Sequence, residues 1–259
     1  MNRKECPIGV FDSGVGGVGT LAALVQELPQ EHYVYYGDML HAPYGTKTTG
    51  EVQQLVRNVV AKLEMEEIKA LVIACNTATG AAAAMLRAEK DYPVIGMEPA
   101  LKPAEECWQG GRILVMATPL TLEQEKFHSL MERFGAHAVP LPCPGLMELV
   151  EREDDSGAKQ YLSELFSEWD LDKVDAVVLG CTNYVFLKPM IRGMLPERIR
   201  ITDGNQGTAR QLRRVLTEKR LLREAGEGSV EMRTSGNAEI LIPVMQRLYR
   251  KGTEISQLP

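Results

Sequence analysis

Two similar segments, each an apolar run that ends at a cysteine, constrain the fold of this chain more than any other feature. Residues 72–74 lead into Cys75, and 106 positions later residues 177–180 lead into Cys181, with Asn and Thr following each cysteine in opposite order. Short unbroken runs of Val, Ile and Leu bounded by turn-forming residues are typical of central strands in a parallel sheet. Open α/β sheets bind their ligands at the carboxyl ends of such strands. The repeat therefore predicts two similar halves that face one pocket, each contributing a cysteine.

Strand-like and helix-like segments alternate along the chain, which is the pattern of βαβ units. We expect an α/β protein with two flavodoxin-like domains, each three-layered around a parallel sheet, related by pseudo-twofold symmetry and with the active site in the cleft between them. The stretch after residue 208 could complete either domain, and residues 151–155 are expected to be a solvated break between helices. The expected strands are residues 7–11, 33–36, 72–74, 92–97, 112–117, 136–141, 177–179, 200–203 and 229–233.

Composition and charge exclude several classes of function. The chain has 259 residues, 44% hydrophobic and 25% charged, as in ordinary globular proteins. The net charge of −6 and the lack of a basic cluster argue against a nucleic-acid partner. No run is long and apolar enough for a signal core or a membrane span, so we expect a cytoplasmic protein without membrane contact. Five scattered cysteines with no CxxC pair indicate free thiols rather than disulfides or structural zinc.

A glycine-rich loop, residues 12–19, follows the first expected strand. Gly14, Gly16 and Gly19 formally match the GxGxxG dinucleotide-binding pattern, but Asp12 would confront the pyrophosphate that a helix N-terminus should attract. Two other interpretations stay open. The glycines could let the backbone approach a small ligand on which Asp12 acts directly, or Asp12 could be an ordinary solvated loop residue.

The two repeated cysteines are the candidates for chemistry. A lone cysteine at a strand end is most often a small buried hydrophobe, which is the interpretation we give to Cys6, Cys107 and Cys143. Cys75 and Cys181 share a context in which a following helix would aim its N-terminus at the sulfur and lower the pKa of the thiol. Without metal-ligand spacing or a cofactor motif, two opposed thiols suggest proton removal on one face of a carbon and delivery on the other. Donors at the strand ends, which suit a carboxylate substrate but could equally be helix caps, are Asn76, Thr77, Thr118, Thr121 and Thr182.

Taken together, these motifs resemble the glutamate racemases of the aspartate/glutamate racemase superfamily. The segments that carry the resemblance are residues 9–17, 43–45, 75–78, 93–100, 117–121 and 180–182, which fall in the family's order. The resemblance implies cofactor-independent interconversion of L- and D-glutamate, which supplies D-glutamate for peptidoglycan, by a homodimer. It also implies that the C-terminal segment completes the first domain, so that residues 1–98 with 208–259 form one domain and residues 99–207 the other.

The resemblance also implies roles for individual residues. Cys75 and Cys181 would be the two bases, Asp12 would assist Cys75, and Glu151 would assist on the side of Cys181. No metal is implied. The substrate-binding positions would be Ser13, Pro43, Tyr44, Gly45, Asn76, Thr77, Thr118, Thr121, Thr182 and Asn183.

One position departs from the family pattern. Members commonly carry histidine after Gly-Cys-Thr, and this chain has Asn183, whose amide cannot take up a proton at neutral pH. We hypothesise that Glu151, water and the local helix end activate Cys181 instead, with unequal kcat in the two directions. The alternative functions are an aspartate or broad-specificity racemase and a non-catalytic regulatory protein on the same scaffold. A contact with DNA gyrase is known in the family, and the acidic charge would suit a protein contact.

Overall fold

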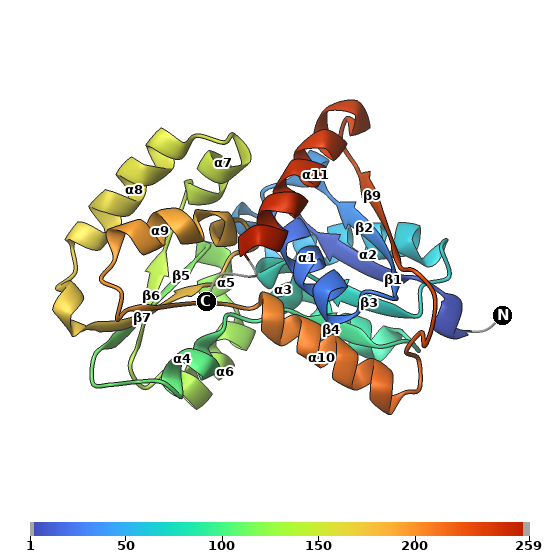
Figure 1. Ribbon diagram of the computed structural model, residues 1–259, viewed down its shortest axis with the longest axis horizontal. Coiled ribbons are helices and arrows are strands. Elements are labelled where there is room, and N and C mark those ends of the chain that lie inside the picture. Colours follow the sequence, from blue (N-terminus) through green and yellow to red (C-terminus); the bar gives the residue numbers. More distant parts are fainter. Residues whose placement is uncertain (1–2, 256–259) are drawn as a thin grey trace.

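The computed structural model describes residues 3–255, which build two parallel β-sheets with helices on their faces (Figure 1). All pairings between described strands are parallel. The first sheet has the order β4-β3-β1-β2-β9, and the second has the order β6-β5-β7-β8. The α/β class with two parallel sheets is therefore confirmed. The strands are β1 (Ile8–Asp12), β2 (His32–Gly37), β3 (Ala70–Ile73), β4 (Val94–Gly96), β5 (Arg112–Ala117), β6 (Ala138–Pro142), β7 (Val174–Leu179), β8 (Arg200–Asp203) and β9 (Ser229–Thr234).

The two sheets share one strand order. Within each, the first strand lies between the second and the third, and the fourth lies beyond the third; β9 is added beside β2. This is the flavodoxin-like order, in which the chain changes direction across the sheet between the first and third strands. Ligands bind outside the carboxyl ends of these two strands, which are β1 and β3 in one sheet and β5 and β7 in the other.

The central strands are apolar because both of their faces are covered. Every residue of β1 and β3 is buried, and the largest apolar cluster contains Val10 and Val72 from the first sheet together with Leu114 and Val177 from the second. The two halves therefore pack against each other through a shared core.

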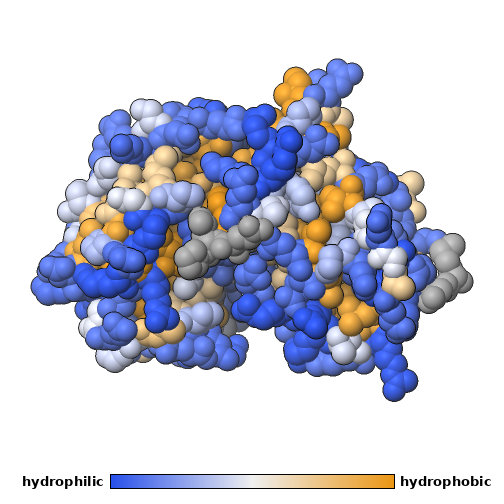
Figure 2. Space-filling model, in the orientation of Figure 1, coloured by the Kyte–Doolittle hydropathy of each residue, from blue (hydrophilic) through white to orange (hydrophobic). Residues whose placement is uncertain are grey.

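Figure 2 shows a predominantly hydrophilic outer surface on the viewed face, with apolar residues at scattered points.

The helices occupy the connections between the strands. In the first half, α1, α10 and α11 lie side by side on one face of the sheet (Figure 1). No helix in residues 3–255 is long and apolar enough to cross a membrane. The α-helices are α1 (Val18–Glu27), α2 (Thr49–Glu64), α3 (Asn76–Glu89), α4 (Leu101–Glu105), α5 (Pro119–Glu123), α6 (Glu125–Phe134), α7 (Leu146–Glu151), α8 (Asp155–Ser167), α9 (Lys188–Met194), α10 (Asn205–Glu218) and α11 (Ala238–Ile255). The 3-10 helices are η1 (Arg3–Glu5), η2 (Met39–His41), η3 (Tyr44–Thr46), η4 (Leu171–Lys173) and η5 (Thr182–Leu187).

The C-terminal segment returns to the first sheet. Strand β9 pairs with β2 along its whole length, from His32 opposite Ser229 to Gly37 opposite Thr234. The division into residues 1–98 with 208–259 and residues 99–207 remains a prediction, because sheet pairing does not define where a domain begins or ends.

Helix α2 begins with a capping box formed by Thr48 and Glu51. The Thr48 side chain accepts a hydrogen bond from the Glu51 backbone N–H at 3.3 Å, and the Thr48 N–H donates to Glu51 Oε2 at 2.8 Å. We expect Thr48→Ala to lower the free energy of unfolding by about 1 kcal/mol, because one orphan N–H loses its acceptor. Urea unfolding measures this loss. Thr48→Ser keeps the hydroxyl and should match the wild type; equal destabilisation by both variants would contradict the prediction.

Candidate active site

Cys75 lies at the carboxyl end of β3 and caps helix α3. Its sulfur accepts a hydrogen bond from the Ala78 N–H at 3.3 Å and lies 3.4 Å from Ser13 Oγ. Burial of the thiol, with the Asp12 charge adding to it, raises the pKa of Cys75 to about 11, although both hydrogen-bond donors act to lower it. The expected helix N-terminus is therefore present, but the expectation of a lowered thiol pKa is wrong, because burial outweighs the helix.

Cys181 follows β7 and lies in a different local structure. The segment after it is the 3-10 helix η5 rather than an α-helix, and the sulfur does not cap that helix. Burial raises the pKa of the Cys181 thiol; the Asn183 N–H acts to lower it, and the charges of Cys75, Asp12 and Glu151 raise it further. The prediction of equivalent helix ends at the two cysteines is wrong on this side.

Asp12 joins the two halves at the end of β1. It is 1% exposed, with Oδ1 accepting from the Gly14 N–H at 2.7 Å and Oδ2 accepting from the Thr182 hydroxyl at 3.1 Å. Burial raises the pKa of the Asp12 carboxyl despite these bonds. The interpretation of Asp12 as a solvated loop residue is wrong. Its carboxylate is buried between Cys75 on one side and the Cys181 motif on the other.

The glycine loop after Asp12 allows this close approach. A Cβ atom on Gly16 would lie 2.7 Å from both the Asn183 nitrogen and Thr182 Oγ1. A Cβ atom on Gly17 would collide with Asp12 itself. In the described structure the backbone of this loop is therefore pressed against the second cysteine motif.

Three hydroxyls lie together on the Cys75 side. Thr77 Oγ1 is 3.1 Å from Thr118 Oγ1 and 2.8 Å from Thr121 Oγ1, and the Thr118 and Thr121 oxygens are 2.9 Å apart. Thr118 caps α5, which has Pro119 in its first turn. The three hydroxyls come from both halves of the chain and can turn their hydrogens toward an anion.

Two further buried residues lie on this side; the sequence analysis assigned neither to this site, although Asp38 is the acidic residue that follows the formal GxGxxG match. Gln124 is buried, donates to the Thr77 carbonyl at 2.9 Å and occupies the space where a side chain on Gly80 would lie. Asp38 is buried after β2 and accepts from the Tyr44 hydroxyl at 2.6 Å. Asp38 follows a strand end just as Asp12 does, which is the signal that could have revealed it; Gln124 has no comparable signal.

The predicted Pro43-Tyr44-Gly45 loop bridges the two halves. Pro43 precedes η3, Tyr44 is buried, and a Cβ atom on Gly45 would lie 3.0 Å from Thr118 Cβ. Asn76, at the start of α3, is also buried; its Nδ2 donates to Met97 Sδ at 3.5 Å.

Glu151 is the last residue of α7, and the solvated break begins only after it, so its predicted place in that break is wrong. Burial, followed by the charges of Asp12 and Glu148, raises the pKa of the Glu151 carboxyl to about 7. The Asn183 side chain and the Val15 backbone act to lower it. Glu151 is thus next to the Cys181 motif and can change protonation state near neutral pH.

The family of the chain follows from comparison with known proteins. A family model described as Asp/Glu/hydantoin racemase matches residues 8–212. The chain belongs to this family. The resemblance drawn from its motifs is confirmed, and so is the expectation of a racemase.

Several relatives and solved structures that resemble this chain are named glutamate racemases. It is 46% identical over 254 residues to a glutamate racemase of Clostridium acetobutylicum, covering 96% of this chain and 99% of the relative. A Bacillus anthracis glutamate racemase structure matches with a TM-score of 0.84, 30% identity and coverage of 95% and 94%. An Escherichia coli glutamate racemase, solved with L-glutamate and the activator UDP-MurNAc-ala, matches with a TM-score of 0.83, 30% identity and coverage of 94% and 95%.

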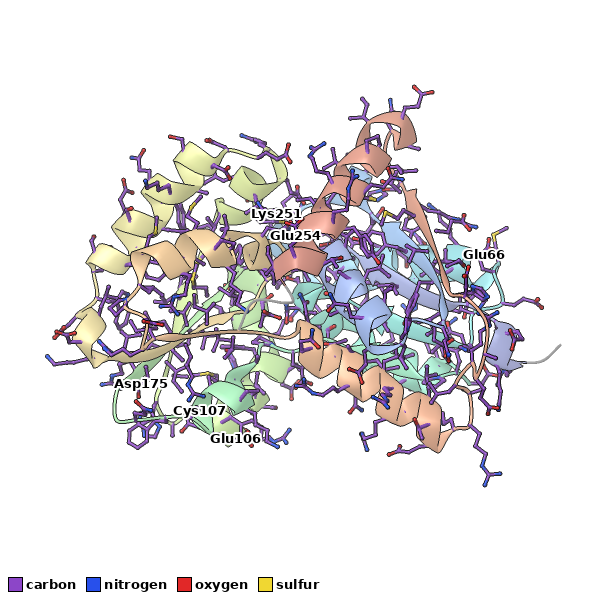
Figure 3. The ribbon with its side chains drawn as sticks, viewed as in Figure 1. Glu66, Glu106, Cys107, Asp175, Lys251 and Glu254 are labelled. Atoms are coloured by element: carbon purple, nitrogen blue, oxygen red, sulfur yellow. The ribbon has the colours of Figure 1, made fainter. Side chains whose placement is uncertain are left out.

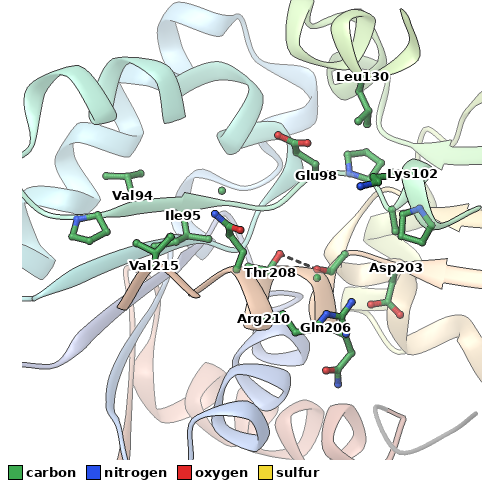
Figure 4. A pocket seen from close by; sticks show the side chains of 18 of the residues that line it. Val94, Ile95, Glu98, Lys102, Leu130, Asp203, Gln206, Thr208, Arg210 and Val215 are labelled. Atoms are coloured by element: carbon green, nitrogen blue, oxygen red, sulfur yellow. Dashed lines mark hydrogen bonds between the residues drawn. The ribbon is translucent and has the colours of Figure 1, made fainter. Parts of the chain in front are cut away.

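Other features of the described residues lie away from this site. Cys107, beside Glu106 at the periphery of the second half, is partly exposed (Figure 3). A cavity of about 900 Å3 between β4, α4, β8 and α10 is lined by residues such as Glu98, Lys102 and Arg210 but by neither Cys75 nor Cys181 (Figure 4). Within residues 3–255, no group of three His, Cys, Asp or Glu side chains is arranged to hold a metal ion.

Proposed function

We propose that this protein racemises glutamate, interconverting the L and D enantiomers without a cofactor and supplying D-glutamate for peptidoglycan synthesis. The observation that carries the proposal is the placement of one buried cysteine after each of the equivalent strands β3 and β7, with Asp12 hydrogen-bonded to the motif of the opposite half. The names of the relatives support glutamate as the substrate.

The mechanism we propose uses the thiols as a pair. In one direction, the Cys75 thiolate removes the α-proton, the C–H electron pair stays on the α-carbon, and the Cys181 thiol donates its proton to the opposite face. The other direction exchanges the roles. Burial raises the pKa of both thiols. The α-ammonium group of a bound amino acid would bring a positive charge near both sulfurs, which favours the thiolate.

The polar groups of the site suit a dicarboxylic amino acid. The hydroxyls of Thr77, Thr118 and Thr121 can donate to a carboxylate, and Asn76 Oδ1, a buried acceptor without a partner among the described residues, can accept from an ammonium group. We assign Ser13, Thr182 and the Tyr44-Gly45 segment to the same binding surface because they border the thiols or the hydroxyl cluster.

Proton NMR in D2O tests this function. L-glutamate and D-glutamate are incubated separately with the protein, and loss of the α-proton signal is followed alongside chiral analysis; L-aspartate serves as the comparison substrate. Washout and inversion from both glutamate enantiomers would support the proposal. Turnover of aspartate without glutamate would assign a sister racemase, and no exchange with either would leave a non-catalytic role.

A further inference from the structure

Two buried oxygen atoms beside Cys181 have no hydrogen-bond partner among the described residues: Glu151 Oε1 and Asn183 Oδ1. Asn183 is only 2% exposed, so its amide is buried in the protein interior. Leaving a buried acceptor unpaired destabilises the folded protein. Two such atoms lie on neighbouring side chains next to a reacting group. A hydrogen-bond donor between them would satisfy both, and a Glu151 carboxylate has no hydrogen to donate.

The two side chains are adjacent in space. Both face the glycine loop, since a Cβ atom on Gly14 would lie 2.5 Å from Glu151 Oε1 and one on Gly16 would lie 2.9 Å from Asn183 Cγ. The Asn183 side chain acts on Glu151 as a hydrogen-bond donor. The amide nitrogen of Asn183 is therefore directed at the carboxyl group, and its oxygen is the atom that lacks a donor.

A protonated Glu151 would satisfy both atoms. A carboxylic acid and a carboxamide each carry a donor and an acceptor, so the two groups can form reciprocal hydrogen bonds. The Glu151 O–H would donate to Asn183 Oδ1 while Asn183 Nδ2 donates to the other Glu151 oxygen. A carboxylate would instead leave Asn183 Oδ1 unpaired.

We propose that Glu151 works in its protonated form, held by Asn183, so that the pair presents no negative charge to Cys181 when that residue becomes a thiolate. This inference rests on the proposed function, in which Cys181 alternates between thiol and thiolate. Glu151 and Asn183 act through Cys181 and are positioning residues. Asparagine cannot take up a proton at neutral pH, so a proton held by this pair resides on Glu151.

The surroundings of Glu151 agree with a neutral carboxyl group. The titratable groups that face it are Asp12 from β1, Glu148 from its own helix, Tyr35 from β2 and Cys181, and each is an acid. Arg247 of α11 is paired with Glu153 at 2.8 Å. The pKa of Glu151, raised to about 7, leaves a large protonated fraction at neutral pH.

The pH dependence of Glu151→Gln tests the proposal, because glutamine imitates the protonated acid at every pH. We expect the ratio of kcat/KM for the variant to kcat/KM for the wild type to be constant below about pH 6 and to rise about tenfold per pH unit above about pH 7, reaching about 10²-fold by about pH 9. A ratio that stays constant or falls with pH would overturn it. Glu148→Gln is the matched control. It removes a charge that raises the pKa of Glu151, so it should lower the pH above which kcat/KM begins to fall relative to that of Glu151→Gln.

Infrared spectroscopy provides a readout that does not depend on activity. The wild type should show the carbonyl band of a protonated carboxyl group at about pH 6 that disappears by about pH 9, and Glu151→Gln should lack this titrating band. Absence of the band in the wild type would overturn the proposal even in an active racemase. A titrating band in a protein that fails the glutamate exchange assay would overturn the proposed function while leaving the protonated pair in place.

Discussion

Cys75→Ala and Cys181→Ala are each expected to lower kcat for racemisation by about 10³-fold or more in both directions. Inversion needs one base to remove the α-proton and an acid on the opposite face to return one, so neither thiol can substitute for the other. Each variant could still exchange the α-proton of one enantiomer without inversion. Chiral analysis together with α-proton washout from L- and D-glutamate in D2O distinguishes these outcomes.

The matched control is Cys143→Ala. Cys143 is also buried after a strand of the second half, and its thiol donates to the Leu141 carbonyl at 3.4 Å, outside the proposed machinery. Replacement of Cys143 by alanine should leave kcat within about twofold of the wild-type value and lower the free energy of unfolding by about 1 kcal/mol. Retention of inversion by either Cys75→Ala or Cys181→Ala would rule out the two-thiol mechanism.

Gly16→Ala is expected to lower kcat/KM by about 10²-fold without unfolding the protein. The new methyl group would lie 2.7 Å from the Asn183 nitrogen and from Thr182 Oγ1, so the glycine loop and the Cys181 motif would have to move apart. Displacements of about 1 Å in a site that depends on aligned groups cost about this much activity. Steady-state kinetics measures the loss, and circular dichroism checks the fold.

Gly50→Ala is the control for this substitution. Gly50 lies in α2, and a Cβ atom there would meet nothing within 4 Å. Alanine at this position should leave kinetics unchanged and stabilise the helix by about 0.5–1 kcal/mol. If Gly16→Ala behaved like Gly50→Ala, the contact between the loop and the Cys181 motif would not matter for the reaction.

Much of the fold could be predicted because its central strands are continuous apolar runs. The strands before Cys75 and Cys181 are buried on both faces, and that burial selects the Val and Ile residues by which they are recognised. Strand β9 lies at an edge with its first three residues exposed, so its sequence carries little of this signal. Only the family resemblance implied that the C-terminal segment belongs with the first domain, and it did not name β2 as the neighbour of β9.

The site was less predictable where its geometry depends on distant packing. Glu151 belongs to a charged run that suggests a solvated segment. Instead, Gly145, whose backbone is left-handed with φ of 81°, precedes α7, and this helix carries Glu151 to the Cys181 motif. Local sequence also does not reveal that the turn after Cys181 is a 3-10 helix. The raised thiol pKa values result from burial by both halves, which no local pattern records.

The pairing of β9 with β2 has a consequence for synthesis on the ribosome. The first four strands of this sheet are complete at Gly96, but its fifth begins at Ser229, so residues 97–228 must be translated in between. At about 5–20 residues per second this takes roughly 7 to 26 s. During that time the free edge of β2 is an unpaired template for aggregation, while the second sheet emerges and can fold first. We expect nascent chains of this protein to need chaperone protection during that interval.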